Sequence, residues 1–210
     1  MSLQLKHPLY LASASPRRHE LLSQIGVEHE IMYVPAPEGE DEPVLAHESA
    51  LAYVQRTALN KLEQALQWRS EQPELHQNSA ILCADTTVEL EGEILAKPRD
   101  LAHAAEMLKA LSGQHHSVHT AACLAYAGQI YQAVSSSQVW FMAMSQAEIA
   151  AYCHTQEPLG KAGAYGIQGA AAAFIKRLEG SYSSVMGLDL YQTYELLLKA
   201  KLLKNIAPHL

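Results

Sequence analysis

The stretch AILCADTTVEL, residues 80–90, decides the fold of this 210-residue chain. It is apolar as far as Ala84, and after Asp85 apolar and polar residues alternate, a pattern that predicts a β-strand. Glu91-Gly92 then predicts a turn that brings the chain back as a hairpin. A carboxylate that closes an apolar strand lies where α/β folds commonly place functional groups.

Helices and strands are mixed on both sides of this stretch. Before it we predict a strand at residues 8–13, a helix that starts at Pro16 and ends at Gly26, a strand at 27–34 and a long helix at 48–69. After it we predict helices at 100–111, 145–154 and 188–204, and strands at 116–126, 130–144 and 172–178. The sequence therefore predicts an α/β fold, with a mixed twisted sheet and flanking helices in a single domain over 1–210.

Composition and charge exclude several classes of function. No apolar run reaches the roughly 18 residues that a membrane span needs. The formal net charge of −7 argues against non-specific nucleic-acid binding, which usually needs a basic face. Cys83, Cys123 and Cys153 are too scattered to form a C-x-x-C pair and are typical of free thiols in a reducing compartment. We therefore expect a cytoplasmic protein with neither a membrane nor a nucleic-acid partner.

The sharpest local motif is Ser-Ala-Ser-Pro-Arg-Arg at residues 13–18, between a predicted strand and a predicted helix. The small residues let the backbone approach a ligand, and a helix N-terminus offers free N–H groups to an anion. Arg17 and Arg18 add planar donors that suit phosphate oxygens. The competing interpretation is a helix cap followed by two solvated arginines. Two cations in a first turn oppose the helix dipole, which favours the phosphate site.

Four other side chains are candidates for the same chemistry. Asp85 could bind Mg²⁺ or accept a proton from water, or it could simply cap a turn at a strand end. Lys61, at the edge of an apolar helix face, and Lys97, after the hairpin, are candidate phosphate ligands that by themselves resemble common surface lysines. Gln168, in a glycine-rich segment, could read a base edge through its donor and acceptor groups.

Two further clusters suggest metal ligands. The acidic loop contains Glu38, and one of its carboxylates could complete a metal site, although most such runs are solvated. His115, His116 and His119 lie on a predicted strand. We do not favour a zinc site there, because the sequence shows no cysteine or acidic partner near them.

Taken in order, these motifs resemble those of the Maf family of nucleotide pyrophosphatases. Residues 13–18 resemble its S-x-S-P-R-R motif, 56–61 its R-x-x-A-x-x-K helix with a shift in spacing, 84–86 with 97–100 its A-D-T…K-P-x-D pair, 161–169 its K-A-G-x-Y-x-I-Q-G motif, and 180–188 the stretch that follows. The motifs run from residue 9 to about residue 197, almost the whole chain. Each is modest alone, but five in this order are highly specific.

The resemblance implies a fold shared with inosine-triphosphatase-like enzymes, with two lobes around a cleft. It also implies that a nucleoside triphosphate is cleaved between its α- and β-phosphates, with a divalent cation, Mg²⁺ or Mn²⁺, as cofactor. By resemblance, Asp85 is the proton acceptor and a metal ligand together with Glu38. Ser13, Arg18, Lys61 and Lys97 belong to the substrate site.

Arg17, Thr86 and Gln168 match positions that are tied to substrate choice in the family. Thr86 with Gln168 is the combination of the branch that acts on dTTP and UTP, and the sister branch acting on 7-methyl-GTP lacks both signatures. Two departures stand out: Gly160 replaces an aspartate that is usual in this branch, and the acidic loop is longer than usual.

Two alternatives remain open. One is pyrophosphatase action on a modified purine triphosphate. The other is a regulatory module that binds a nucleotide or a cell-division partner without turnover, since the family has been linked to septum formation. A homodimer is compatible with either.

Overall fold

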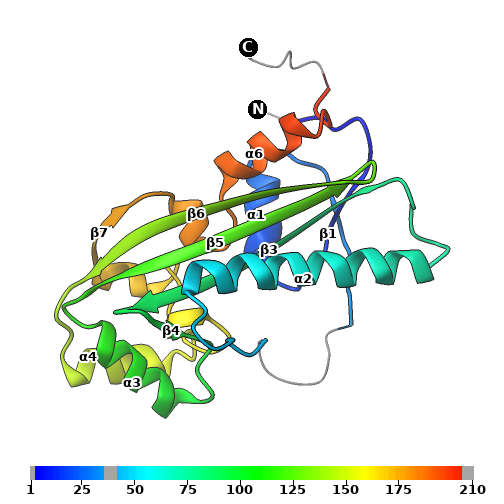
Figure 1. Ribbon diagram of the computed structural model, residues 1–210. Helices are drawn as coiled ribbons and strands as arrows, with labels where there is room; N and C mark the ends of the chain where they lie inside the picture. Colours follow the sequence, from blue (N-terminus) through cyan, green and yellow to red (C-terminus); the bar gives the residue numbers. More distant parts are fainter. Residues whose placement is uncertain (1–2, 36–41, 205–210) are drawn as a thin grey trace.

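The computed structural model describes residues 3–35 and 42–204, which are built around a seven-stranded sheet (Figure 1). The strands are β1 (Leu9–Leu11), β2 (Glu30–Ile31), β3 (Ala80–Leu90), β4 (Glu93–Leu95), β5 (His115–Tyr126), β6 (Gln129–Phe141) and β7 (Ile175–Glu179). Their order is β2-β1-β3-β5-β6-β7, with β4 beside β3. β1 pairs in parallel with β2 and β3, whereas the other pairs are antiparallel. The predicted mixed α/β sheet is confirmed.

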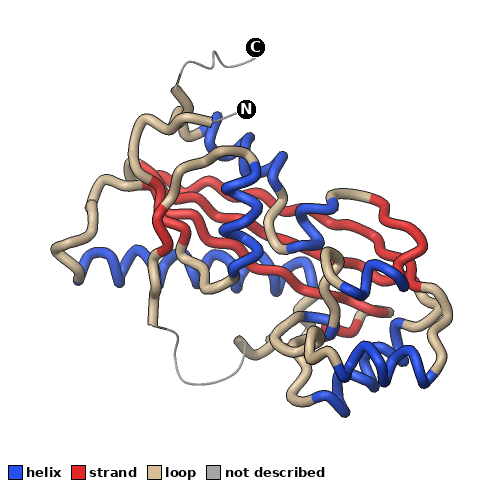
Figure 2. Tube along the Cα trace, turned by 180° about the vertical axis from the view of Figure 1, so that it is seen from behind, coloured by secondary structure: helices blue, strands red, loops and turns tan. Residues whose placement is uncertain are grey.

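Helices cover both faces of this sheet. They are α1 (Pro16–Gln24), α2 (Ala50–Glu71), α3 (Leu101–Leu111), α4 (Gln146–His154), α5 (Tyr182–Met186) and α6 (Leu190–Lys199). The long α2 crosses one face, and α1 and α6 lie on the opposite face (Figures 1 and 2). The predicted caps are present: the Asp100 side chain accepts from the backbone of His103, and Ser145 forms a capping box with Glu148.

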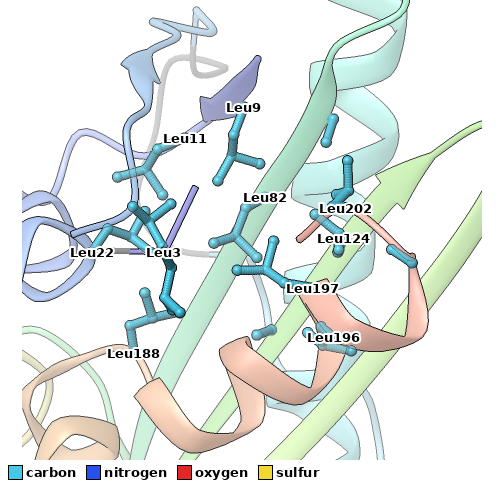
Figure 3. Close-up of a cluster of buried hydrophobic side chains, with 14 of the residues drawn as sticks. Leu3, Leu9, Leu11, Leu22, Leu82, Leu124, Leu188, Leu196, Leu197 and Leu202 are labelled. Atoms are coloured by element: carbon cyan, nitrogen blue, oxygen red, sulfur yellow. The ribbon is translucent and has the colours of Figure 1, made fainter. Parts of the chain in front are cut away.

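The alternation of side chains along β3 divides the apolar core. Ile81 and Cys83 face α2, whereas Leu82 and Ala84 join a leucine-rich cluster with α1 and α6 (Figure 3). Further along that second face, Val88 belongs to a separate cluster with α3 and α4. This face of the sheet thus carries two separate apolar clusters, one with α1 and α6 and the other with α3 and α4.

Hydroxyl side chains separate these two clusters. Thr86 and Thr120 lie 3.0 Å apart (Oγ1–Oγ1) on neighbouring strands, and Ser135 follows at the next strand. α5 is anchored over them, because Ser184 meets Ser135 (Oγ–Oγ 2.7 Å) and its carbonyl oxygen accepts from Thr120 (2.8 Å). The sheet thus carries a polar strip between two apolar cores.

Some predicted elements differ from the observed ones. The strand predicted at 27–34 is reduced to Glu30–Ile31, because it pairs only with the three-residue β1. Residues 170–174 form a 3₁₀ turn, so that β7 starts at Ile175 and not at 172. The last helix is shorter than predicted and ends at Lys199. α5 was missed because five residues are too few to show a helical period.

The three cysteines are free and buried, in agreement with their scattered positions. Near the ends of the described chain, Leu5 and Leu203 form an antiparallel bridge. Among the described residues, no helix combines the length and the apolar character that crossing a bilayer requires.

Leu82→Ala should destabilise the fold strongly, because Leu82 is fully buried in the cluster between β3, α1 and α6. We expect a loss of about 2–5 kcal/mol in the free energy of unfolding, measured by urea titration. The matched control is Leu45→Ala, a 54% exposed position, for which a change within about 0.5 kcal/mol is expected. Equal losses in the two variants would contradict this assignment of the core.

Candidate active site

The candidate site lies beside the middle of β3. β5 pairs with one edge of β3 along nearly its whole length, from Ile81 to Glu89. On the other edge, β1 pairs with residues 80–82 and β4 with residues 88–90. Within the described chain, residues 83–87 pair with neither of these two strands. Asp85 therefore lies inside β3 and does not end it, although the apolar run stops at Ala84. It lies just past the carboxyl end of the parallel strand β1.

Asp85 is held from the α2 side. Its Oδ2 accepts a hydrogen bond from Thr57 Oγ1 (2.7 Å), and its Oδ1 forms an ion pair with the ammonium of Lys61. The two helix residues are four positions apart, so they project from one face of α2. Sequence reasoning found Lys61 and missed Thr57, although their i, i+4 spacing was a signal that could have revealed it.

The surroundings of Asp85 keep its carboxylate ionised. Burial raises the pKa of Asp85, but the positive charges of Lys61 and Arg18, together with the hydrogen bonds from Lys61 and Thr57, outweigh burial and lower this pKa. The Asp85 side chain is 15% exposed and that of Lys61 40%. The Asp85 carboxylate thus lies among positive charges, and the more exposed Lys61 stands between it and solvent.

Arg18 connects three of the predicted motifs. Its Nε donates to the carbonyl oxygen of Gly187 (2.7 Å), Nη1 to Ser13 Oγ (3.1 Å) and Nη2 to Thr86 Oγ1 (3.4 Å). Three of its five N–H groups are thus used within the protein. Burial lowers the pKa of Arg18, an effect that Asp85 opposes and Arg17 reinforces. In this structure Arg18 mainly fixes the turn at Ser13 and the position of Thr86.

Arg17 lies beside Arg18 and is less constrained. Its Nε donates to the carbonyl oxygen of Met186 (3.2 Å), at the end of α5. Burial lowers the pKa of Arg17, against the opposing charge of Glu20. Both arginines are therefore oriented by backbone carbonyls at residues 186 and 187, a role of this segment that the sequence did not indicate.

The glycine-rich segment 161–169 packs on the β3–β4 hairpin. A Cβ on Gly163 would lie 2.9 Å from Val88 Cγ2, and the backbone there has a φ of +69°, so only glycine fits without strain. Gly163 N also donates to the carbonyl oxygen of Ala96 (3.3 Å), next to the exposed Lys97. The exposed Gln168 lies within this segment. Lys97 thus follows the residue that Gly163 contacts, and Gln168 lies near the other end of the same segment.

Gly160, where the resemblance leads one to expect an aspartate, is exposed and has a φ of +71°. No atom lies within 4 Å of a Cβ built there. A side chain at this position would point into open space, so the replacement removes a carboxylate without a packing defect.

Of the two candidate metal ligands, Asp85 and Glu38, the structure describes Asp85. Glu38 lies outside the described residues, and within those residues no group of three or more His, Cys, Asp or Glu side chains could hold a metal ion. The one described carboxylate of the acidic run, Glu42, binds Arg56 (2.9 Å) and Asn60 (2.7 Å) on α2. A single carboxylate such as Asp85 still suits Mg²⁺, which usually keeps waters and takes substrate phosphates as further ligands.

The expectation about the histidines needs a correction. His119 does have an acidic partner, because its Nε2 lies 3.0 Å from Glu89 Oε2, and its Nδ1 lies 2.7 Å from Ser136 Oγ. The sequence could not show this, since Glu89 comes from the neighbouring strand β3. His116 instead contacts Tyr165 (Nε2–Oη 2.7 Å) on the opposite face.

Lys61→Met should weaken the fold in a pH-dependent way. A lowered folded-state pKa of Asp85 stabilises the protein above the unfolded-state pKa of about 3.9, and this stability is lost as the pH falls through the folded-state value. Without Lys61, burial raises the Asp85 pKa with less opposition. We expect a loss of about 1–3 kcal/mol at pH 7, reduced because solvent screens Lys61, and a smaller loss at pH 4. Urea unfolding at both pH values measures it; a loss independent of pH would indicate packing alone.

Known proteins resemble this chain in sequence over most of its length. The sequence model of the family described as Maf-like protein matches residues 8–200. A dTTP/UTP pyrophosphatase of Bordetella pertussis is 53% identical over 91% of this chain and 92% of its own length. One from Cupriavidus pinatubonensis is 51% identical over 92% and 97%, respectively. The solved structure of the Ham1 protein of Staphylococcus aureus matches 64% of this chain and 71% of its own chain at 14% sequence identity. The TM-score of this match is 0.41. The chain belongs to the Maf family.

Proposed function

We propose that this chain hydrolyses dTTP and UTP to the nucleoside monophosphate and pyrophosphate. The observation that carries the proposal is the ion pair of Asp85 with Lys61, beside Arg18, which reaches the neighbouring Thr86. A triphosphate carries about four negative charges, so its binding needs such cations and its cleavage needs charge stabilisation. The substrates come from the names of the relatives and from Thr86 and Gln168.

Asp85 is the proposed proton acceptor. Water attacks the α-phosphorus, a P–O bond forms, the bond to the bridging oxygen breaks, and pyrophosphate leaves while the water proton passes to Asp85. In the free protein the low pKa of Asp85 makes it a weak base. Substrate phosphates that draw Lys61 away and bring negative charge near would raise this pKa, which improves proton transfer.

A divalent cation, Mg²⁺ or Mn²⁺, is the proposed cofactor, with Asp85 as its ligand in the described chain. When bound together with the triphosphate, the cation would neutralise charge on the phosphate oxygens. The chain's own residues supply the rest: Lys61, Arg17 and Lys97 are proposed to bind phosphate, and Arg18 and Ser13 hold the start of α1, which carries Arg17.

A panel of nucleoside triphosphates assayed for pyrophosphate release tests the substrate assignment. We expect dTTP and UTP to be the preferred substrates and 7-methyl-GTP a poor one, with activity abolished by EDTA and restored by excess Mg²⁺ or Mn²⁺. Faster release from 7-methyl-GTP would establish the purine alternative. Tight nucleotide binding without release from any substrate would establish the regulatory alternative.

Asp85→Asn tests the proposed base. The amide keeps the shape of the side chain but cannot accept the proton, so we expect kcat for UTP to fall by about 10²–10⁴-fold. Circular dichroism should show a native fold. The control is Glu106→Gln, an exposed carboxylate on α3, which should keep wild-type activity. Wild-type turnover by Asp85→Asn at saturating UTP would remove Asp85 from the mechanism.

A further inference from the structure

Tyr152, in the last turn of α4, and Glu157, just after this helix, hold the glycine-rich segment by hydrogen bonds. Glu157 Oε1 accepts from Tyr152 Oη (2.9 Å), and Oε2 accepts from the backbone N–H of Ala170 (2.9 Å). Tyr152 Oη in turn accepts from Gly166 N (3.3 Å). We refer to these three hydrogen bonds as the Glu157 clamp. It connects α4 with the backbone at two positions, 166 and 170.

These two positions lie on either side of Gln168. Residues 163–167 are buried, and Tyr165 and Ile167 belong to the apolar cluster with α3 and α4, whereas Gln168 is exposed. The Gln168 side chain lies over Gly166, because a Cβ built on Gly166 would come within 3.4 Å of Gln168 Oε1. The structure therefore presents Gln168 at the surface on a backbone that is held on both sides of it.

Glu157 also occupies the space beside Gly169. A Cβ built on Gly169 would lie 2.6 Å from Glu157 Oε2, and the other two atoms nearest to it belong to the same carboxyl group. The backbone of Gly169 has a φ of −103°, which any residue can adopt. The need for glycine at position 169 therefore comes from the Glu157 carboxylate and not from the backbone conformation.

A carboxylate suits the two donors that meet at this point. It offers two acceptor oxygens, and hydrogen bonds to a charged acceptor are roughly twice as strong as neutral ones. The amide of a glutamine has one acceptor oxygen and one donor group, so it would leave either Tyr152 Oη or Ala170 N without its acceptor. Glu157→Gln therefore loosens the clamp and keeps the size of the side chain.

We propose that Glu157 is a positioning residue that holds Gln168 in place to read the nucleobase, and that it is thereby a determinant of substrate choice. Uracil and thymine differ from cytosine in the donor and acceptor groups of the edge that an amide side chain reads. A Gln168 on a mobile backbone would adapt to either pattern, whereas a fixed one discriminates between them. The inference rests on the proposed function for its substrate, but the clamp itself does not require turnover.

The first test compares kcat/KM for UTP and CTP. The wild type should prefer UTP, and in Glu157→Gln the UTP-to-CTP ratio should fall by about tenfold, the effect of one lost hydrogen bond to a charged group. The loss should appear as a higher KM for UTP with kcat within about threefold of wild type, because Asp85 and Lys61 are untouched. Glu106→Gln is the matched control and should keep the wild-type ratio. An unchanged ratio in Glu157→Gln, or a wild type without preference, would overturn the proposal.

Gly169→Ala tests the same clamp from the other side. The added methyl group should displace the flexible Glu157 carboxylate and lower the UTP-to-CTP ratio as Glu157→Gln does. In a Glu157→Ala background the space is already vacant, so Gly169→Ala should lower the ratio by less than about twofold more. A full additional loss in that background would show that position 169 acts without Glu157 and would contradict the clamp.

Gln168→Ala separates positioning from a general structural role. If Glu157 acts through Gln168, adding Glu157→Gln to Gln168→Ala should cause no further loss of the UTP-to-CTP ratio. Multiplicative losses would show that Glu157 acts by another route and would overturn the proposal. Glu157→Gln should also melt within a few degrees of wild type, because the buried Tyr165 and Ile167 still anchor the segment; a large loss of melting temperature would assign Glu157 to the fold.

Amide hydrogen exchange distinguishes this proposal from the proposed function. In the unliganded protein, Glu157→Ala should speed exchange at Ala170 N and Gly166 N by about tenfold or more and leave the amides of β5 unchanged. If this is found but wild type releases pyrophosphate from no nucleotide, the hydrolase function fails and the clamp remains. If wild type hydrolyses UTP and Glu157→Ala changes neither the exchange nor the UTP-to-CTP ratio, the hydrolase stands and the role of Glu157 does not.

Discussion

The pairing of β3 with β5 along one edge is the constraint on which the rest of the structure depends. Because this edge of β3 is occupied from Ile81 to Glu89, β1 and β4 must share the other edge, and they leave residues 83–87 between them. The alternation of the strand then places Asp85 toward α2 and Thr86 toward α1. One short piece of strand thus presents a carboxylate and a hydroxyl to opposite faces of the sheet.

Contacts within the protein hold three cations near this part of β3, namely Lys61, Arg17 and Arg18. Lys61 comes from α2, which covers the Asp85 side, and Arg18 comes from the first turn of α1 and reaches Thr86 on the other side. Backbone carbonyls at Met186 and Gly187 hold the two arginines. Positive side chains close together are costly unless acceptors or an anion compensate them. Arg18 has three acceptors within the protein, whereas Arg17 has one hydrogen bond among those found in the described chain and keeps more donors for a ligand.

A strip of hydroxyl side chains divides the apolar core on one face of the sheet. Two apolar clusters on one face of the sheet are separated by the hydroxyls of Thr86, Thr120 and Ser135, and α5 is anchored over them by Ser184. Hydrogen bonds satisfy these hydroxyl groups, as the burial of polar atoms requires. Asp85 retains its charge for the same reason, since its ion pair and hydrogen bonds outweigh the cost of burial.

Sequence patterns alone determined β3 to the residue, the caps at Asp100 and Ser145, the mixed α/β class and the candidates Arg17, Lys61, Asp85, Thr86 and Gln168. These signals are local, because strand alternation, helix caps and motif order are properties of neighbouring residues. The tertiary structure decided the partners: Thr57 for Asp85, Glu89 for His119, and the carbonyls at 186 and 187 for the arginines. Each of these pairs joins elements far apart in the chain, and its geometry depends on sheet order and helix placement, which no single stretch of sequence specifies.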